Sequence, residues 1–444
     1  MFKNNPPKLV SFIVSFTVLP IAIYSVQRFS THPVGNTAIW WLIQLVVVLI
    51  LLISGILFFE SENKKHFLFI NLFLIWVVFS LIRGVFMAEN YWDYKSLIER
   101  SFELLLPVIA YTASNKERLQ SILSFYVKFI LPFSILFLIP IPRGGWGWSW
   151  FLISFIILFL PVLKVQWRIL LVVLSLVAAF ADFSVRSHII KYAIPIVLLL
   201  LYYFRFFIAS YEIINVSRKI FIIAPWVLFF LAVSGIFNIF RIGDHVKVDY
   251  EAEARDQHGV LVETQSVTKD SRTFIYTEVL KSAKKYDYWI LGRSPSRGNE
   301  TVAFAGFIEK ITGKPERYSN EANVPNIFTW MGIIGLFLYF LVFYNASYLA
   351  IKKSNNIYIK LVGLFVAFRW LYAWVEDYSS FGMNDFTIWV MIGICSSQSF
   401  RKMNDLEVKL WARGIFDDRY VKLMMFIKKG NFQNYPVIHK IDHL

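Results

Sequence analysis

The chain has 444 residues, of which 57% are hydrophobic and 17% charged, and its formal net charge is +15. Soluble domains are closer to half apolar and a quarter charged, so this composition predicts an integral membrane protein. The positive charge does not indicate nucleic acid, because most of it lies in short segments between apolar runs, where juxtamembrane lysines and arginines gather. The single cysteine, Cys395, excludes an internal disulfide and a cysteine metal cluster.

About twelve apolar segments are long enough to be transmembrane helices, which predicts an all-α polytopic protein. The first segment lacks a small-residue cleavage site and is interpreted as a retained helix. The fourth is the weakest, since Glu99, Arg100 and Glu103 lie in its first turns. In chain order the segments are 9–27, 38–59, 66–87, 95–113, 119–140, 148–163, 167–183, 187–208, 218–240, 324–350, 357–376 and 383–400.

The loops between these segments alternate between rich and poor in lysine and arginine. By the positive-inside rule, the basic set and both termini lie in the cytoplasm. The long segment 241–323 then lies outside. We therefore divide the chain into transmembrane helices 1–9 (1–240), an outer loop subdomain (241–323), transmembrane helices 10–12 (324–400) and a cytoplasmic amphipathic tail (401–444).

Helical spacing of apolar residues predicts two helices in the outer loop, at 271–287 and at 300–313, the second ending at Gly313. The second half of the loop is cationic and includes Arg272, Arg293 and Arg297. Arginine is suited to phosphate because its planar, permanently charged fork binds two oxygens at once. The stretch LGRSPSRGNE (291–300) is therefore a candidate anion site, with an ordinary solvated turn as the alternative.

Other charged residues are predicted at or near membrane depth. Arg186 lies at the outward mouth of the eighth segment, where it either binds an anion or snorkels to the interface. Arg369 lies inside the eleventh segment, seven residues before Glu376, and needs either an acidic partner or a cavity. Glu99 and Glu103, one turn apart, are candidates to pair with these cations or to act as a base.

The sequence contains no Walker loop and no GxSxG motif. Its nearest approach to a metal site is the acidic run DYEAE, which is interpreted as solvated acids. The first outer loop has no acid, whereas metal-dependent lipid-linked glycosyltransferases of the oligosaccharyltransferase type carry an aspartate there. We predict neither a metal nor a cofactor.

Four stretches carry a family resemblance. RYSNEANVPNIFTWMGIIGLFLYFLVF (317–343) resembles the C-terminal motif of bacterial O-antigen and capsular-polysaccharide polymerases and their O-antigen ligase relatives. Three others are similar to segments of the same superfamily, in the same order: SVRSHIIKY, SRTFIYTEVL and WILGRSPSRGN. The ligase histidine before the tenth span is absent, and Asn320, Glu321 and Asn323 stand in its place.

The resemblance implies a membrane glycosyltransferase of GT-C-like class in the bacterial inner membrane. It would polymerise undecaprenyl-diphosphate-linked oligosaccharide repeat units into O-antigen or capsular polysaccharide at the periplasmic face. Its partners would be these lipid-linked sugars, membrane lipids, and a chain-length regulator and flippase of the same pathway.

For individual residues, the resemblance and the charge pattern together suggest a diphosphate cradle and a base. The base would be Glu321, with Glu99 and Glu103 as competitors. The cradle would comprise Arg186, Arg272, Arg293 and Arg297, with Arg369 as a further member.

Three alternatives stay open. An O-antigen ligase would use the lipid A core as acceptor. A transporter or flippase of lipid-linked sugars is a second alternative, although the sequence has neither the paired halves nor the broken helices common in transporters. A non-catalytic scaffold for an export complex is the third.

Overall fold

The computed structural model describes residues 8–27, 29–30, 35–139, 141–182, 186–205, 210–240, 251–255, 261–266 and 272–428. Over these residues the protein is all-α apart from four short strands, which confirms the predicted fold class at this level. Helices α1 to α10 precede the middle of the chain: α1 (Lys8–Phe16), α2 (Val18–Gln27), α3 (Thr37–Phe58), α4 (Leu68–Met87), α5 (Tyr91–Leu105), α6 (Ile109–Ala113), α7 (Lys116–Phe125), α8 (Leu131–Leu138), α9 (Trp146–Ser149) and α10 (Leu152–Ile156).

The second half of the chain contains the remaining helices and all the strands. They are α11 (Val165–Phe180), α12 (Arg186–Tyr203), α13 (Ser210–Val233), β1 (Glu251–Arg255), β2 (Leu261–Ser266), α14 (Thr273–Tyr286), β3 (Asn299–Glu300), α15 (Ala305–Thr312), β4 (Glu316–Arg317), α16 (Asn323–Lys352), α17 (Ile357–Tyr372), α18 (Met383–Ser396), α19 (Gln398–Lys402), α20 (Asp405–Phe416) and α21 (Asp418–Lys428). Short 3-10 or π turns link several of them, among them Tyr126–Ile130 and Ile157–Val162.

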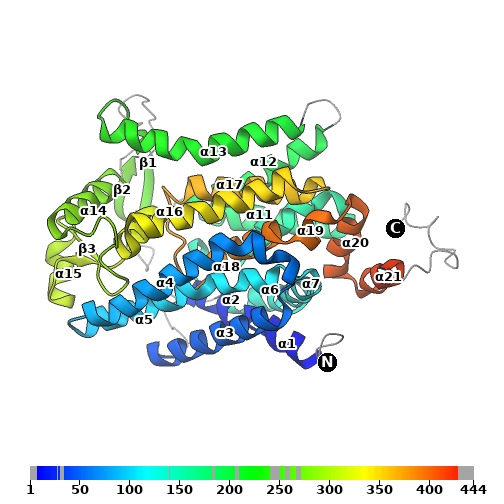
Figure 1. Ribbon diagram of the computed structural model, residues 1–444, viewed down its shortest axis with the longest axis horizontal. Helices are drawn as coiled ribbons and strands as arrows, with labels where there is room; N and C mark the ends of the chain where they lie inside the picture. The colour runs from blue at the N-terminus through cyan, green and yellow to red at the C-terminus, as the bar shows by residue number, and fades with distance from the viewer. Residues whose placement is uncertain are drawn as a thin grey trace.

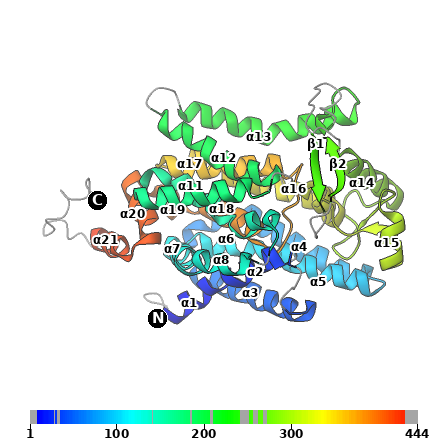
Figure 2. The ribbon, with the colours of Figure 1, turned by 180° about the vertical axis from the view of Figure 1, so that it is seen from behind.

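The long helices run roughly along one axis of the molecule (Figure 1). At one end lie α14, α15 and the antiparallel hairpin β1–β2, and at the opposite end lie α1, α20 and α21 (Figure 2). The predicted outer loop and the predicted cytoplasmic tail are therefore at opposite ends of the bundle, which we call the outer and inner ends.

Among the described residues, six helices are long and apolar enough to cross a membrane, and the bent pair at 143–162 is a seventh if it forms one span. Three shorter apolar helices correspond to the seventh, eighth and twelfth predicted segments: Val165–Phe180, Ser187–Tyr203 and Met383–Ser396. These findings confirm a multi-pass membrane protein. The number twelve stays a prediction, because the predicted fourth and eleventh segments correspond to α5–α6 and α17, which contain charged residues.

Both helices predicted in the outer loop are confirmed, as α14 and α15. α15 ends where expected, because Gly313 takes the left-handed conformation with φ +75° that closes many helices. The acidic run predicted to be solvated contributes β1, which pairs with β2.

The tenth predicted span, α16, is interrupted at Gly332, whose φ of +67° is non-helical. A Cβ there would lie 2.1 Å from the carbonyl oxygen of Ile290, so only glycine allows this approach. The outer loop docks at the break, because the amide of Ile333 donates to Trp289 O (2.9 Å) and that of Arg293 donates to Thr329 O (2.6 Å). The start of LGRSPSRGNE is thus joined to a transmembrane helix by main-chain hydrogen bonds.

The inner end is closed by α20, which begins with a capping box formed by Asn404 and Glu407. Trp411 is buried, and its Nε1 donates to Lys116 O at the start of α7 (2.9 Å). α20 is therefore a packed part of the bundle, whereas the sequence suggested a segment lying on the membrane surface. The rest of the predicted tail after Lys428 is outside the described residues.

Candidate functional site

The outer end is organised around the segment 373–382, which follows α17. Arg272 precedes α14 and its Nε donates to Val375 O in this segment (3.0 Å). Its Nη1 forms an ion pair with Glu321, which also meets Arg317 Nη2 at 3.4 Å. The Glu321 side chain is 52% exposed. The structure thus brings together two predicted residues, Arg272 and Glu321, and adds a second arginine.

An apolar groove of about 580 Å³ lies next to Arg272. Its walls are the outer half of α13, one face of α14 and the end of α17. Val375, which accepts from Arg272, lines the groove, and Lys281 adds a further cation to the lining. The remaining lining is largely aliphatic and aromatic: Pro225, Leu228, Phe229, Ala232, Val233, Asn238, Ile239, Phe240, Thr273, Tyr276, Thr277, Leu280, Leu371 and Trp374.

A buried polar cluster lies on the other side of the 373–382 segment. Arg100 forms an ion pair with Glu103 and stacks over the Trp330 ring, 5.0 Å from its centroid. Glu103 also lines a cavity of about 20 Å³ together with Asn323, Ser379 and Asp385. This volume suffices for about one water molecule. Glu103, whose side chain is 11% exposed, therefore borders a small cavity with three other polar side chains and largely apolar walls, an environment in which a base can operate.

The two features are connected through Asp377. Its amide donates to Glu321 O at 2.9 Å, while its carboxylate accepts from the amide of Ser379 at 2.9 Å. Burial raises the pKa of Asp377, and the nearby Arg100 guanidinium opposes that shift. Glu99 lies one turn before Glu103 on α5 and contributes to the same local field.

Arg369 is fully buried on α17. Its Nη2 donates to Asn384 Oδ1 (2.9 Å), and its guanidinium carbon lies 4.6 Å from the centroid of the Tyr378 ring. Its Nε and Nη1 make no hydrogen bond to the part of the chain that the structure describes. Glu376 forms an ion pair with Lys191 of α12 instead, so the first partner of Arg369 is an amide and not an acid.

Arg293 and Arg297 share one buried carboxylate, that of Glu316 on β4. Arg293 Nη2 lies 2.9 Å from Glu316 Oε1, and its Nη1 donates to Gly298 O at 2.6 Å. Arg297 binds both oxygens of Glu316 (3.0 and 2.6 Å) and meets Glu89 at 2.9 Å. The hydrogen bonds to Glu316 raise the pKa of Arg297. Both arginines therefore hold the LGRSPSRGNE turn closed on the protein.

The arginines predicted to form one diphosphate cradle therefore have different partners at separate sites. Arg272 meets Glu321, Arg293 and Arg297 meet Glu316, and Arg369 lies beside Asn384. Arg186 is the first residue of α12, and its side chain falls outside the described part of the chain.

Sequence reasoning missed the role of three residues. Arg317 belongs to the cationic half of the outer loop, and its spacing of four from Glu321 is a signal in the sequence that the two side chains can pair. Arg100 was treated only as weakening a span. Asp377 could not be recognised from the sequence, because its burial depends on contacts with α5 and with the residues before α16.

Among the described residues, no group of three or more His, Cys, Asp or Glu side chains is arranged to hold a metal ion. No protein-family model matches the chain, and no curated protein is detectably similar to it in sequence.

Proposed function

We propose that the protein is a membrane glycosyltransferase. It joins oligosaccharide units carried on a polyprenyl diphosphate, at the outer face of the membrane that it spans. One observation carries the proposal: an apolar groove of about 580 Å³ at the outer end of the bundle is lined by Lys281 and by Val375, whose carbonyl oxygen accepts a hydrogen bond from Arg272. A polyprenyl diphosphate needs these two environments next to each other, one for its hydrocarbon chain and one for its charge.

The groove supports the binding of an isoprenoid because its aliphatic and aromatic walls bury apolar surface without polar cost. Arg272 touches its lining through Val375, and Lys281 lies within that lining. A diphosphate at the mouth of the groove would meet Arg272, Arg317 and Lys281. The proposal therefore rests on these three cations, and assigns Arg293 and Arg297 to the structure of the loop.

The reaction is a displacement at the anomeric carbon of the donor sugar. The acceptor hydroxyl oxygen forms a bond to that carbon, the bond from the carbon to the diphosphate oxygen breaks, and the electron pair leaves with the polyprenyl diphosphate. Fixed guanidinium groups stabilise the charge that develops on the leaving group. The hydroxyl proton passes to a carboxylate, for which Glu321 is the first candidate and Glu103 the second.

Glu321 is suited to accept this proton because its carboxylate is exposed and is held by Arg272 and Arg317, two of the three cations of the proposed diphosphate site. A diphosphate that draws these arginines toward itself would free the Glu321 carboxylate to accept a hydrogen bond from the acceptor hydroxyl. Glu103 is less accessible, but its polar cavity adjoins the same segment through Asp377.

The test uses purified protein in lipid nanodiscs with a defined polyprenyl-diphosphate-linked repeat unit as the only sugar source. We expect a ladder of longer glycans, lost in Arg272→Gln and kept in Lys310→Gln, which removes an exposed cation of α15. A ladder that is unchanged in Arg272→Gln would refute the proposed site. Glycan transfer only after addition of lipid A core would identify the ligase alternative.

A further inference from the structure

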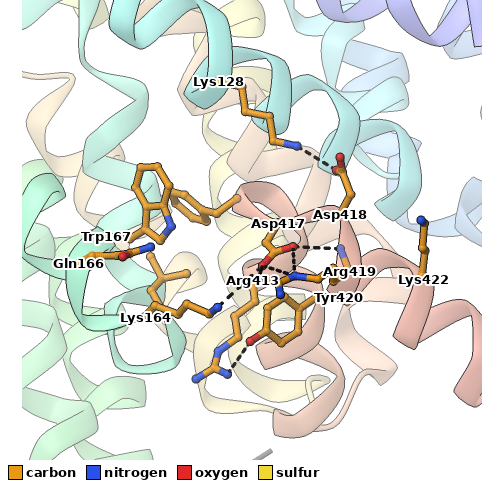
Figure 3. A pocket seen from close by; sticks show the side chains of 12 residues that line it. Lys128, Lys164, Gln166, Trp167, Arg413, Asp417, Asp418, Arg419, Tyr420 and Lys422 are labelled. Atoms are coloured by element: carbon orange, nitrogen blue, oxygen red, sulfur yellow. Dashed lines mark hydrogen bonds and ion pairs between the residues drawn. The ribbon is translucent and has the colours of Figure 1, made fainter. Parts of the chain in front are cut away.

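A second cavity, of about 390 Å³, lies at the inner end, where the 3-10 turn before α11, the π turn at 126–130 and the α20–α21 junction meet (Figure 3). Five basic and two acidic side chains line it, an excess of three positive charges. The basic residues are Lys128, Lys164, Arg413, Arg419 and Lys422, and the acids are Asp417 and Asp418. The cavity is therefore suited to an anion.

The ion pairs within the cavity do not neutralise all of its positive charge, so cationic side chains remain able to bind a ligand. Lys128 Nζ lies 2.8 Å from Asp418 Oδ1, yet the Asp418 side chain is 75% exposed, so this pair is open to competition. Lys164 lies 3.8 Å from Asp417, which is more closely held by Arg419 at 2.8 Å. Both lysines point toward the cavity from elements on opposite sides of it (Figure 3).

Arg413 gives the cavity a rigid inner wall. Its side chain is buried, its Nε donates to Val162 O at 2.8 Å, and its Nη1 donates to Tyr420 Oη at 3.3 Å. Trp167 forms another part of the wall and packs against Phe416, with ring centroids 4.7 Å apart. The cavity is thus built from packed residues of the fold and is more than a group of surface lysines.

Two helices begin at the cavity. α11 starts at Val165, directly after Lys164, and α21 starts at Asp418. The dipole at the N-terminus of a helix favours negative charge. At α21 the amide of Arg419 already donates to Asp417 Oδ1 at 3.1 Å, so there the dipole and not that amide adds to the charge of the lysines and arginines.

The flanks of the cavity indicate what kind of anion it would take. On α11, Val165 and Ile169 are 64% and 60% exposed and share one face, which leads from the cavity along the helix. On the other flank, Phe129 and Phe133 are exposed next to Lys128. A cationic site bordered by outward-facing apolar residues of a membrane protein is suited to an anionic lipid, with its headgroup in the cavity and its acyl chains along the helices.

We propose that this cavity binds the phosphate headgroup of an anionic phospholipid from the cytoplasmic leaflet. Lys128 and Lys164 contact the phosphate, and α11 and α8 contact the acyl chains. The inference is independent of the proposed glycosyltransferase activity, because it concerns the opposite end of the molecule and its test measures lipid binding.

The experiment compares wild-type protein with Lys128→Gln/Lys164→Gln and with the control Lys352→Gln/Lys353→Gln, which removes two cations at the C-terminal end of α16. Each protein is purified in detergent and titrated with phosphatidylglycerol, phosphatidylcholine or glycerol phosphate. Retained lipid is counted by native mass spectrometry, and thermal unfolding is followed in parallel. We expect phosphatidylglycerol retention to fall roughly 30-fold in the cavity variant, since it lacks two juxtamembrane cations and each contributes on the order of 1 kcal/mol.

A further variant separates binding from folding. Asp418→Asn removes the acid that competes for Lys128, so we expect it to retain more phosphatidylglycerol than wild type. Equal retention in the cavity variant and the control would overturn the proposal. So would stabilisation by glycerol phosphate equal to that by phosphatidylglycerol, which would mark a site for soluble phosphates, or equal retention of phosphatidylcholine.

Discussion

Two groups of arginines at the outer end look alike in sequence and differ in structure. Arg293 and Arg297 bind Glu316, whose side chain is 5% exposed, and Arg272 and Arg317 bind Glu321, which is 52% exposed. A buried ion pair cannot release one partner without leaving an uncompensated charge, whereas an exposed pair exchanges with water or a ligand at little cost. The exposure of the acid therefore separates arginines that maintain the fold from arginines that are available to a substrate.

The largest expected effect comes from removing the buried acid. Glu316→Gln leaves Arg293 and Arg297 without their common counter-charge, so we expect a loss of about 3–5 kcal/mol in the stability of the outer loop. Limited proteolysis between residues 272 and 317 and thermal unfolding would measure it. Glu321→Gln is the matched control and is expected to cost at most about 1 kcal/mol. Equal destabilisation by both would remove the distinction.

The second prediction concerns activity. Arg272→Gln is expected to lower the rate of glycan transfer about 100-fold while thermal unfolding stays close to wild type, because a lost transition-state contact of this kind costs about 3 kcal/mol. Arg293→Gln is expected to lower stability and activity together. Both variants are compared by rate and by melting temperature. If Arg272→Gln also lowered the melting temperature, Arg272 would belong with the structural arginines.

The third prediction tests the docking that keeps Arg293 buried. Gly332→Ala is expected to destabilise the protein by about 2 kcal/mol, because alanine disfavours the positive φ and its Cβ would meet Ile290 O. Gly306→Ala is the control, since a Cβ there meets nothing within 4 Å. Thermal unfolding measures both variants, and similar behaviour would mean that the outer loop does not depend on the break in α16.

The smallest expected effect is a pH dependence of stability, caused by Glu89 and Asp93 near Arg297. Hydrogen bonds from Lys314 and Arg297 lower the pKa of Glu89 from its ordinary value of 4.5. Burial alone would raise the pKa of Asp93, but hydrogen bonds from Tyr318, the Glu89 amide and Lys314 outweigh it and lower that pKa below 3.8.

Because these two pKa values are lowered in the folded state, the stability they contribute is present above about pH 4.5 and is lost as the pH falls through the folded values. Melting temperatures between pH 6 and pH 3 would show it, and Lys314→Gln is expected to flatten the curve. A variant curve as steep as that of wild type would assign the acid sensitivity to other groups.

Features that depend on local pattern were predictable from the sequence. Helical spacing gave α14 and α15, and Gly313 marked the end of the second helix. Apolar runs gave the class of the protein. The alternation of loop charge agreed with the separation of the outer loop from α20 and α21 (Figure 1).

The partners of charged side chains were not predictable, because they depend on the way distant segments pack. Nothing in the sequence near Arg293 indicates that it forms an ion pair with Glu316, 23 residues later. The spacing of seven between Arg369 and Glu376 suggests a shared helix face, yet α17 ends at Tyr372 and Glu376 pairs with Lys191 of α12. Type and spacing identified the charged residues of interest, and only the fold decides which of them are neutralised within the protein.

The break at Gly332 has a consequence for biogenesis. The main-chain bonds between residues 289–293 and 329–333 require the loop and the later helix to be present together. During synthesis residues 289–293 emerge before α16, and they cannot complete these hydrogen bonds until that apolar stretch has been made and inserted into the bilayer. Maturation of this region is therefore tied to a later insertion step, and premature termination before Gly332 would leave residues 289–293 without these partners.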